Sequence, residues 1–389
     1  MTITTNFPAI SETRCNEHPD ILRPALKVHW RLPQGGGNVT RSRATMNASD
    51  ATALPDLENQ LKFARKAEAL GIDSLLVDFG YNKPDSIILS TALGLQTKRI
   101  KFIIASRSGL MSPATFVQQL NTLSALIDGR FSLNMVAGHS PVEQRYYGDF
   151  LSHDERYART GEYLDICHRF WRRENYPVNF SGEYYQIENG EIKTPFVSPE
   201  RSAPEIFIAG SSAPAVELAH AAGDIWVTLA QPVDLLAQAA ANMVAGNKEV
   251  AIRLSVICRE TREEAIAAAE ELIQKQTDEA IAEKGFVTKS DSVGIKRALD
   301  EADGVASHWL TSCLWNGAVK SFGAPSIALV GSPKDIADAI IEYYQIGVTQ
   351  LILSGWPQFE EMCLFGQSVL PLLRQKVKTM SSNATNQQM

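Results

Sequence analysis

Short apolar runs recur along this chain and alternate with segments of helical periodicity. Most runs consist of Ile, Val, Leu and Phe without strict polar alternation, a pattern typical of parallel strands that are buried on both faces. The pattern predicts eight strands, at residues 26–32, 74–79, 101–106, 131–136, 205–209, 225–229, 252–257 and 350–354. Eight strand-and-helix units in one series favour an α/β fold of the closed (β/α)8 TIM-barrel type.

The helices between these strands have recognisable ends. One is predicted to begin at Pro55 and to end at Gly71, because proline suits a first helical turn and glycine suits a helix end. Ser112, with the proline after it, begins another. Residues 261–264 and 332–335 have the spacing of capping boxes, in which the first and fourth side chains cap each other's backbone.

An open, doubly wound sheet is the main alternative fold. It would need a dinucleotide-binding fingerprint of spaced glycines between a strand and a helix. Gly35, Gly36 and Gly37 follow the first strand, but their spacing is wrong and the polar residues after them predict a loop. The barrel is therefore the preferred fold.

One barrel domain is predicted over residues 26–375. An N-terminal extension at 1–25 precedes it, and a polar C-terminal tail at 376–389 follows it. Two insertions are longer than ordinary barrel connections, and insertions of this kind are usually lids or binding loops. They span about 176–204, with a hairpin near 182–185, and about 277–325.

Composition narrows the classes of function. The chain has 389 residues, of which 37 are basic and 44 acidic, so its net charge of −7 lacks the basic excess that nucleic-acid binding needs. Its five cysteines are odd in number and contain no C-x-x-C pair, which argues against a disulfide framework or a zinc site and fits a reducing cytoplasm. No run of ~18 apolar residues predicts a membrane span, so a soluble, cytoplasmic protein is expected.

The chemistry of such a barrel is confined to the carboxyl ends of its strands. Few residues there are carboxylates. The chain contains no acid pair for glycoside hydrolysis, no G-x-S-x-G elbow, no H-E-x-x-H motif and no clustered metal ligands, so no metal site is predicted. A site with polar, small and aromatic side chains but little chemistry of its own fits an enzyme that holds an organic cofactor.

Gly210, Ser211 and Ser212 form the clearest binding motif. They lie between the predicted strand at 205–209 and a helix whose first turn contains Pro214. Free backbone N–H groups and the positive end of the helix dipole make such a turn a seat for an anion, above all a phosphate. In the alternative interpretation, one of the two serines is only a helix N-cap.

Four motifs, in this order and spacing, resemble those of a known family. They are VAGHSP at 136–141, LSHDERY at 151–157, FIAGSS at 207–212 and LSGWP at 353–357. Together they resemble the flavin-site signature of the bacterial luciferase-like flavin-dependent monooxygenases, and most closely that of the alkanesulfonate monooxygenase branch. The resemblance covers roughly residues 26–375.

The resemblance implies a two-component enzyme. In this family a separate NAD(P)H:flavin reductase supplies reduced FMN (FMNH2). The reduced flavin reacts with the co-substrate O2 to form a C4a-(hydro)peroxide, which inserts one oxygen atom into an organic substrate. No nucleic acid or membrane partner is expected, and relatives often form homodimers or homotetramers.

The resemblance also implies which residues hold the flavin. Tyr157 and Arg156 would contact its phosphate together with the two serines, and His153 would reach the phosphate or the ribityl chain. A non-prolyl cis peptide behind the flavin ring would fall at Ala105–Ser106. The expected cofactor-binding residues are Ser106, Ala137, Gly138, His153, Arg156, Tyr157, Gly210, Ser211 and Ser212.

The substrate side departs from the alkanesulfonate pattern. Gly35 and Lys83 stand where the sulfonate enzymes have a histidine and a cysteine, Trp356 and Gln358 replace a tyrosine and a histidine, and only Arg253 is retained. An alkanesulfonate needs several fixed donors, so these changes predict a different substrate, and the added tryptophan suits a neutral or larger one. The candidate catalytic residues are Arg253, His139, Lys83 and Lys320, and the candidate substrate contacts are His29, Trp356, Gln358 and Ser255.

Three other functions remain open at this point. The same scaffold can bind the deazaflavin F420 and transfer hydride. It can also oxygenate a substrate displayed on a carrier protein. A flavin-binding protein without catalytic activity is the third possibility, and it belongs to a different functional class.

Overall fold

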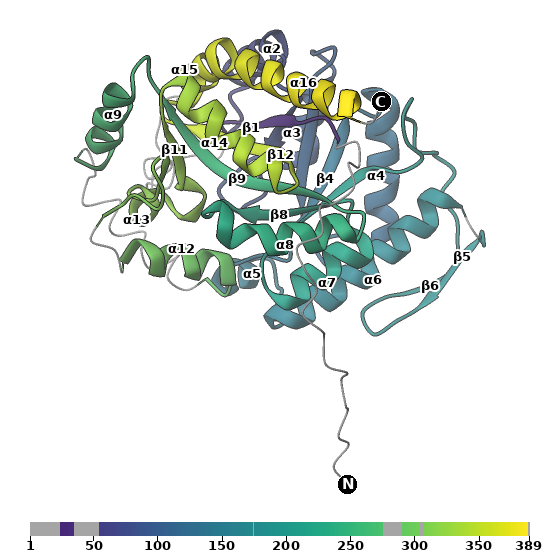
Figure 1. Cartoon of the computed structure of the whole chain (residues 1–389). Coiled ribbons are helices and arrows are strands. Elements are labelled where there is room, and N and C mark those ends of the chain that lie inside the picture. Colours follow the sequence, from purple (N-terminus) through teal and green to yellow (C-terminus); the bar gives the residue numbers. More distant parts are fainter. Residues whose placement is uncertain (1–23, 35–53, 174, 275–289, 304–306, 388–389) are drawn as a thin grey trace.

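The computed structural model (Figure 1) describes residues 24–34, 54–173, 175–274, 290–303 and 307–387. Eight parallel strands close into a barrel that helices surround. In barrel order they are β1 (Lys27–Arg31), β2 (Ser74–Val77), β3 (Lys101–Ser106), β4 (Phe131–Met135), β7 (Glu205–Ala209), β8 (Ile225–Leu229), β9 (Glu249–Cys258) and β12 (Val348–Gly355). Parallel pairing of β12 with β1 closes the ring. The predicted (β/α)8 fold and its eight strands are confirmed.

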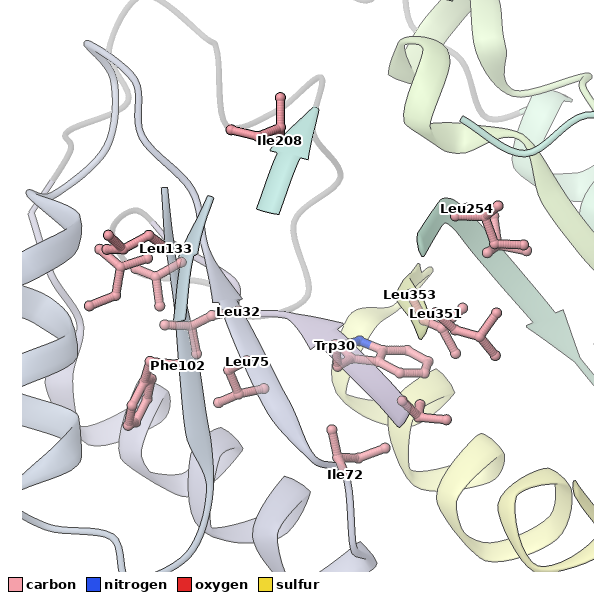
Figure 2. Packing of buried hydrophobic residues seen from close by; sticks show 14 of the residues in the cluster. Trp30, Leu32, Ile72, Leu75, Phe102, Leu133, Ile208, Leu254, Leu351 and Leu353 are labelled. Carbon is pink, nitrogen blue, oxygen red and sulfur yellow. The ribbon is translucent and has the colours of Figure 1, made fainter. Parts of the chain in front are cut away.

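Alternate side chains of each strand enter two different cores. Phe102 and Ile104 of β3 belong to the large cluster between strands and helices, whereas Ile103 belongs to a smaller cluster made only of strand residues. Figure 2 shows part of the large cluster, with Trp30 of β1 and Leu133 of β4. Because both strand faces exclude water, the strands lack polar alternation. Each large apolar side chain buried in this way stabilises the fold by ~1.5–3 kcal/mol.

The helices follow the strands and have the capping expected of them. Asp56, one residue after Pro55, caps the first helix, and Gly71 ends it with a left-handed φ of 80°. Both predicted capping boxes form, at 261–264 and at 332–335. The main helices are α2 (Leu57–Leu70), α3 (Ser86–Gly94), α4 (Pro113–Leu126), α6 (His153–Arg172), α7 (Ala213–Ala222), α8 (Val233–Ala245), α9 (Arg262–Gln274), α14 (Pro333–Gln345), α15 (Gln358–Leu364) and α16 (Leu370–Gln387).

The first insertion contains the predicted hairpin. Strands β5 (Val178–Ser181) and β6 (Gln186–Gly190) pair antiparallel, and the Gly182 N–H donates to the Tyr185 carbonyl at 2.9 Å. In Figure 1 this hairpin projects to one side of the barrel, on the side of α6. It therefore does not form part of the barrel sheet.

The second insertion contributes three short elements beside the barrel. They are α12 (Val293–Asp303), β10 (Leu314–Trp315) and α13 (Val319–Phe322). After them comes β11 (Ala328–Gly331), which pairs parallel with the last part of β9 and lies outside the ring. Strand β11 was not predicted from the sequence, because an apolar run of four residues between two turns is too short to distinguish from a loop.

Two further expectations concern the termini and one peptide bond. Helix α16 continues to Gln387, so most of the predicted polar tail is helical. The expected cis peptide at Ala105–Ser106 is wrong. Among the described residues, the cis bonds are the two prolyl bonds Tyr176–Pro177 and Trp356–Pro357. A non-prolyl bond prefers the trans form by ~2.5–4 kcal/mol. Residues 1–23 and 35–37 lie outside the described residues, and within the described ones no helix is long and apolar enough to span a membrane.

Candidate active site

A cavity of about 600 Å³ opens over the carboxyl ends of the barrel strands. Side chains from all eight strand ends border it, and the second insertion adds residues 292–295 and 319–325. The predicted site residues that border the cavity are Lys83, Ala137, Gly138, His139, His153, Tyr157, Gly210, Ser211, Ser212, Arg253 and Lys320. The other predicted site residues are not among its lining residues; these are Ser106, Arg156, His29, Ser255, Trp356 and Gln358.

One end of the cavity is built from hydroxyl groups and a glycine. This hydroxyl end consists of Tyr157, Gly210, Ser211 and Ser212. Gly210 has φ 143°, and a Cβ there would lie 2.6 Å from the Tyr157 hydroxyl oxygen and equally close to the Ala215 Cβ. Only glycine therefore leaves this turn open.

Tyr157 is fixed against the same turn. Its hydroxyl donates to the Ala209 carbonyl at 3.2 Å, and the Trp226 indole N–H donates to the Gly210 carbonyl at 2.7 Å. Burial raises the pKa of Tyr157 to about 12, so the phenol keeps its proton at neutral pH. Its single proton is given to the Ala209 carbonyl in this structure and would turn to a charged acceptor that entered the hydroxyl end.

The two serines of the hydroxyl end differ in their hydrogen bonds. Ser211 Oγ lies 3.0 Å from Thr228 Oγ1 and forms a hydrogen bond with it. Ser212 occupies the N-cap position of α7, yet its side chain makes no capping bond, and its buried Oγ has no hydrogen-bond partner in the described part of the chain. Buried hydroxyls are rarely left unsatisfied. The interpretation of these serines as mere N-caps is therefore not supported.

His153 begins α6 beside the hydroxyl end. Its ring lies 5.0 Å from the Tyr157 ring between centroids, and its Nδ1 lies 2.6 Å from Asp154 Oδ1. Ser152 and Glu155 form a capping box at this helix start. The histidine is therefore held at the cavity edge by its own helix.

Arg156 has a structural role instead of the expected phosphate contact. It is 1 % exposed, and it donates to the carbonyls of Ala137, Gly138 and Leu151 at 2.9, 3.3 and 2.9 Å. Its Nη2 also pairs with Asp291 Oδ2 at 2.5 Å. The guanidinium thus holds the turn after β4, and a direct contact with a cavity ligand is not supported.

The turn after β4 lines the cavity with backbone and one amide. Gly138 has φ 85°, and a Cβ there would overlap the Gln144 side chain. Asn134 Oδ1 is buried without a partner in the described residues, while His139 lies close to the second insertion. Ser106 does not border the cavity, although its neighbours Ala105 and Arg107 do. This side therefore presents backbone groups of residues 136–139 and the Asn134 amide to the cavity.

The opposite end of the cavity is charged. Asp78 Oδ2 accepts from Arg31 Nε at 2.6 Å and from Lys83 Nζ at 2.9 Å. Burial disfavours charge on Asp78, but Lys83 and Arg31 outweigh it and hold the pKa of this carboxyl well below its usual range. Gln34 fixes the backbone of Asp78 through two hydrogen bonds, of 2.7 and 3.1 Å. The three charged groups are therefore preorganised.

A second buried ion pair adjoins this cluster. Arg107 Nη2 lies 2.5 Å from Glu143 Oε2, and both side chains are 5 % exposed. The guanidinium stacks near the rings of Phe79 and Tyr147, at 5.0 and 5.8 Å from their centroids. We refer to Arg31, Asp78, Lys83, Arg107 and Glu143 as the charged end.

Arg253 of β9 lies between the two ends. Its Nη1 donates to the carbonyls of Leu254 and Ile352 at 2.7 and 3.1 Å, and its Nη2 donates to Ser354 Oγ at 3.0 Å. Ser255 does not border the cavity, but its Oγ lies 2.8 Å from Ser354 Oγ. Ser255 therefore holds Ser354 in place, and Ser354 in turn holds the Arg253 guanidinium.

The expected substrate contacts lie outside the lining. His29 is 2 % exposed in β1, where its Nε2 bonds to Gln350 Oε1 at 2.9 Å, one inward-facing position below Arg31. Burial lowers the pKa of His29 to about 4. Trp356 packs on Phe322, with ring centroids 5.4 Å apart, and only Phe322 borders the cavity. Direct substrate contact by His29 and Trp356 is not supported.

Gln358 and Lys320 occupy supporting positions. With its amide oriented to satisfy both groups, Gln358 donates to the Arg31 carbonyl at 2.9 Å and accepts from Arg31 Nη1 at 3.0 Å. Lys320 pairs with Asp303 at 2.7 Å, and both side chains are well exposed. Gln358 thus acts through Arg31, whereas Lys320 belongs to the cavity rim.

A model of the luciferase-like monooxygenase family matches residues 36–350. The chain belongs to this family. The predicted family and class of enzyme, a flavin-dependent monooxygenase, are confirmed, while the narrower place in the alkanesulfonate branch stays a prediction.

Solved structures of several luciferase-like proteins and their relatives share the fold. A riboflavin lyase has 18% identity and a TM-score of 0.72, over 91% of this chain and 92% of its own. EDTA monooxygenase from Chelativorans sp. BNC1 has 18% identity and a TM-score of 0.70, over 91% and 94%. An F420-dependent secondary alcohol dehydrogenase has 17% identity and a TM-score of 0.63, over 90% and 99%. At these identities the likeness concerns the fold alone.

The hydroxyl end fits the phosphate of a flavin mononucleotide, which family membership makes the natural cofactor to test. The unpartnered Ser212 Oγ, the donor Tyr157 and the space kept by Gly210 converge where the helix α7 begins. A helix start with free N–H groups and hydroxyl donors is chemically suited to a phosphate. The residues present therefore fit this group.

Most residues of the charged end of this luciferase-like protein were not predicted from its sequence. Arg31 follows His29 by two residues in β1, so strand alternation could have placed both inside the barrel. Asp78 was hidden because the predicted strand at 74–79 runs two residues beyond the observed end at Val77. Glu143 had no sequence signal, because its partner lies 36 residues away.

Proposed function

We propose that this protein is a two-component, FMNH2-dependent monooxygenase that inserts one atom of O2 into an organic substrate. The observation that carries the proposal is the buried, unpartnered Ser212 Oγ at the start of α7, beside Gly210 and Tyr157. When bound, reduced FMN supplies the electrons that activate O2, so that one oxygen atom enters the substrate and the other leaves as water.

The hydroxyl end would hold the phosphate of FMN. Ser211, Ser212 and Tyr157 present hydroxyl groups, and the first turn of α7 adds backbone N–H groups and the positive end of its dipole. Hydrogen bonds to a charged phosphate are stronger than those between neutral groups. His153 stands next to Tyr157 and would contribute a further donor at the cavity edge.

The backbone of the β4 turn would face the flavin ring. Ala137 and Gly138 border the cavity, and Arg156 fixes both of their carbonyl groups from behind. Asn134 offers an amide whose oxygen has no partner among the described residues. Ring binding would therefore rest on a rigid surface that needs little reorganisation.

Arg253 would stabilise negative charge at the centre of the cavity. Three protein acceptors hold its guanidinium in place, so its position does not depend on a ligand. A preorganised cation in a site that excludes water is effective against developing charge. His139, Lys83 and Lys320 are the other candidates for moving or holding a proton, and all three border the cavity.

A separate NAD(P)H:flavin reductase would deliver the reduced cofactor. The sequence has no dinucleotide-binding fingerprint, so electrons would come from a second protein. A homodimer or homotetramer remains the expected assembly. Location in the cytoplasm remains the expectation from the cysteine pattern.

The substrate would be a polar organic molecule that is not a simple alkanesulfonate. The expected apolar contribution of Trp356 is absent, since that ring lies behind Phe322. Arg31 and Lys83 border the charged end instead, and Asp78 orients both. A substrate with an acceptor group at one end fits this arrangement. The substrate panel therefore includes free molecules and the same molecules attached to a carrier protein.

One experiment tests the proposal against its alternatives. The purified chain is incubated with an FMN reductase, NADH, labelled O2 and a panel of polar organic substrates, and products are measured by mass spectrometry. We expect a gain of one labelled oxygen atom, and its loss in Arg253→Ala. Binding titrations with FMN and F420 accompany it. Hydride transfer from reduced F420 without oxygen incorporation, or flavin binding without turnover of any panel member, would favour the alternatives.

A further inference from the structure

The start of α12 faces the hydroxyl end from the second insertion. Gly294 lies so close that a Cβ there would be 3.3 Å from Ser211 Oγ. Ser292, Val293 and Gly294 all border the cavity. Two helix starts, those of α7 and α12, therefore meet at Ser211. Nothing in the sequence motifs indicated this, because the two helices are about eighty residues apart.

The first turn of α12 has N–H groups to offer. The Ser292 side chain accepts from the Ile295 N–H at 3.4 Å, which satisfies one of them. In the described part of the chain, the N–H groups of Val293 and Gly294 make no hydrogen bond. The first four N–H groups of any helix lack partners within the helix and need an outside acceptor.

We propose that the start of α12 is the second half of the phosphate site. In this arrangement the N–H groups of Val293 and Gly294 bind the same phosphate as the start of α7. The inference rests on the proposed function. A second observation points to the same ligand, because Ser212 Oγ, buried to about nine-tenths, borders this space and has no partner. An anion between the two helix starts would satisfy all of these donors.

Gly294 itself supports a close approach of backbone and ligand. Glycine within a helix costs ~1 kcal/mol relative to alanine, so its presence needs a compensating gain. Here the missing side chain keeps Ser211 and the helix backbone within reach of one another. A larger residue at 294 would fill the space that the phosphate takes.

A buried connection holds the start of α12 in this position. The His139 carbonyl accepts from Ser290 Oγ at 2.9 Å and from the Asp291 N–H at 3.0 Å. Asp291 Oδ2 pairs with Arg156, which also binds the carbonyls of Ala137 and Gly138. Arg156 is therefore a positioning residue, because it links the turn after β4 to the start of α12.

Charge supports the same assignment. The Asp291 carboxylate stands just before α12, where it would repel a phosphate if it were alone. Arg156 lies 2.5 Å away and neutralises it.

The test compares two ligands that differ only in the phosphate. Oxidised FMN and riboflavin are titrated into the full chain, and dissociation constants are measured by fluorescence. We expect the wild type to prefer FMN. Gly294→Val should weaken FMN binding about tenfold or more, a loss of about 1.4 kcal/mol, while riboflavin binding changes less than about threefold. Gly294→Ala, whose Cβ would lie 3.3 Å from Ser211 Oγ, should weaken FMN binding in the same direction but by less, about three- to fivefold.

The controls separate this inference from the proposed function. Asp300→Asn alters an exposed residue of the same helix that does not border the cavity, and it should leave both ligands unaffected. If Gly294→Val and Gly294→Ala retain the full preference for FMN, α12 does not hold the phosphate, although the enzyme would still bind FMN. If Gly294→Val does not fold by circular dichroism, Gly294→Ala decides alone. If the wild type binds neither ligand, the proposed function itself fails.

Discussion

The two ends of the cavity use opposite electrostatic designs. The hydroxyl end relies on hydroxyl groups, a glycine and helix starts, with no formal charge among Tyr157, Gly210, Ser211 and Ser212. The charged end relies on two ion-pair groups, one centred on the partly exposed Asp78 and one on the buried Glu143. A neutral hydroxyl without a partner costs less free energy than an unpaired buried charge, so hydroxyl groups can await an anion, whereas buried charges must be paired before any ligand arrives.

This difference suggests separate tasks for the two ends, with cofactor binding at the hydroxyl end and substrate discrimination at the charged end. A site of neutral donors suits a ligand that always carries the same charge, such as a phosphate. A preassembled set of charges suits discrimination among substrates, because a group that mismatches them leaves buried charges poorly solvated. The hydroxyl end is therefore the place to test the cofactor, and the charged end is the place to test the substrate.

The largest expected effect follows from removing the carboxylate that the charged end shares. Asp78→Asn leaves Arg31 and Lys83 close together without the charge that holds them, and we expect a loss of about 3–5 kcal/mol in the free energy of unfolding. Urea denaturation measures it. The exposed Asp300→Asn serves as control and should change stability by less than about 0.5 kcal/mol. A loss below about 1 kcal/mol in Asp78→Asn would show that the cluster contributes little to the fold.

The next effect depends on pH and on the histidine beneath the charged end. Burial lowers the pKa of His29 to about 4, below the value of about 6.5 expected in the unfolded chain. Between these pH values the unfolded chain binds more protons than the folded one, so stability should fall as pH falls from about 6.5 to about 4. Each unit of pKa difference corresponds to about 1.4 kcal/mol.

Thermal and urea unfolding across that pH range would measure this dependence. His29→Gln keeps a polar side chain near Gln350 but cannot take up the proton. The variant should therefore lose stability less steeply than the wild type between pH 6.5 and 4. Parallel curves for the two proteins would mean that other groups cause the acid sensitivity.

The smallest effect distinguishes the two serines of the hydroxyl end. Ser212→Ala should leave the free energy of unfolding unchanged within about 0.5 kcal/mol, since Oγ has no partner, but should weaken FMN binding about tenfold. Ser211→Ala removes the bond to Thr228 and should cost about 1 kcal/mol of stability as well. Paired urea and FMN titrations measure both quantities. A Ser212→Ala protein with unaltered FMN affinity would remove this serine from the phosphate site.

The barrel could be predicted from sequence because its signal is local and repeated. Strands buried on both faces are mostly apolar, so each of the eight left a short apolar run, interrupted in β1 and β4 by polar residues such as His29 and Asn134. The hydroxyl end was equally visible, since Gly210, Ser211 and Ser212 are consecutive. Strand β11 was missed because its four residues are too few to show a pattern.

The remaining site features depend on contacts that no single segment contains. Arg156 resembles a phosphate donor at a helix start, but three carbonyl groups and Asp291 take up its donors in the folded chain. Trp356 faces Phe322 instead of the cavity, which follows from how β12 ends and not from its composition. Long-range geometry, unlike hydrophobic periodicity, has no local trace in the sequence.

Strand β9 has a mechanical consequence for the insertion above the cavity. Two residues beyond Arg253, Ser255 donates from its Oγ to the Pro325 carbonyl at the end of the insertion at 3.0 Å, and from its N–H to the Ile327 carbonyl just after it at 2.7 Å. The described part of the insertion is thus fixed to the barrel at Pro325 through Ser255 and at Asp291 through Arg156. Moving either end away from the cavity would break one of these contacts, so access to the cavity is coupled to the strand that carries Arg253 and to the turn after β4.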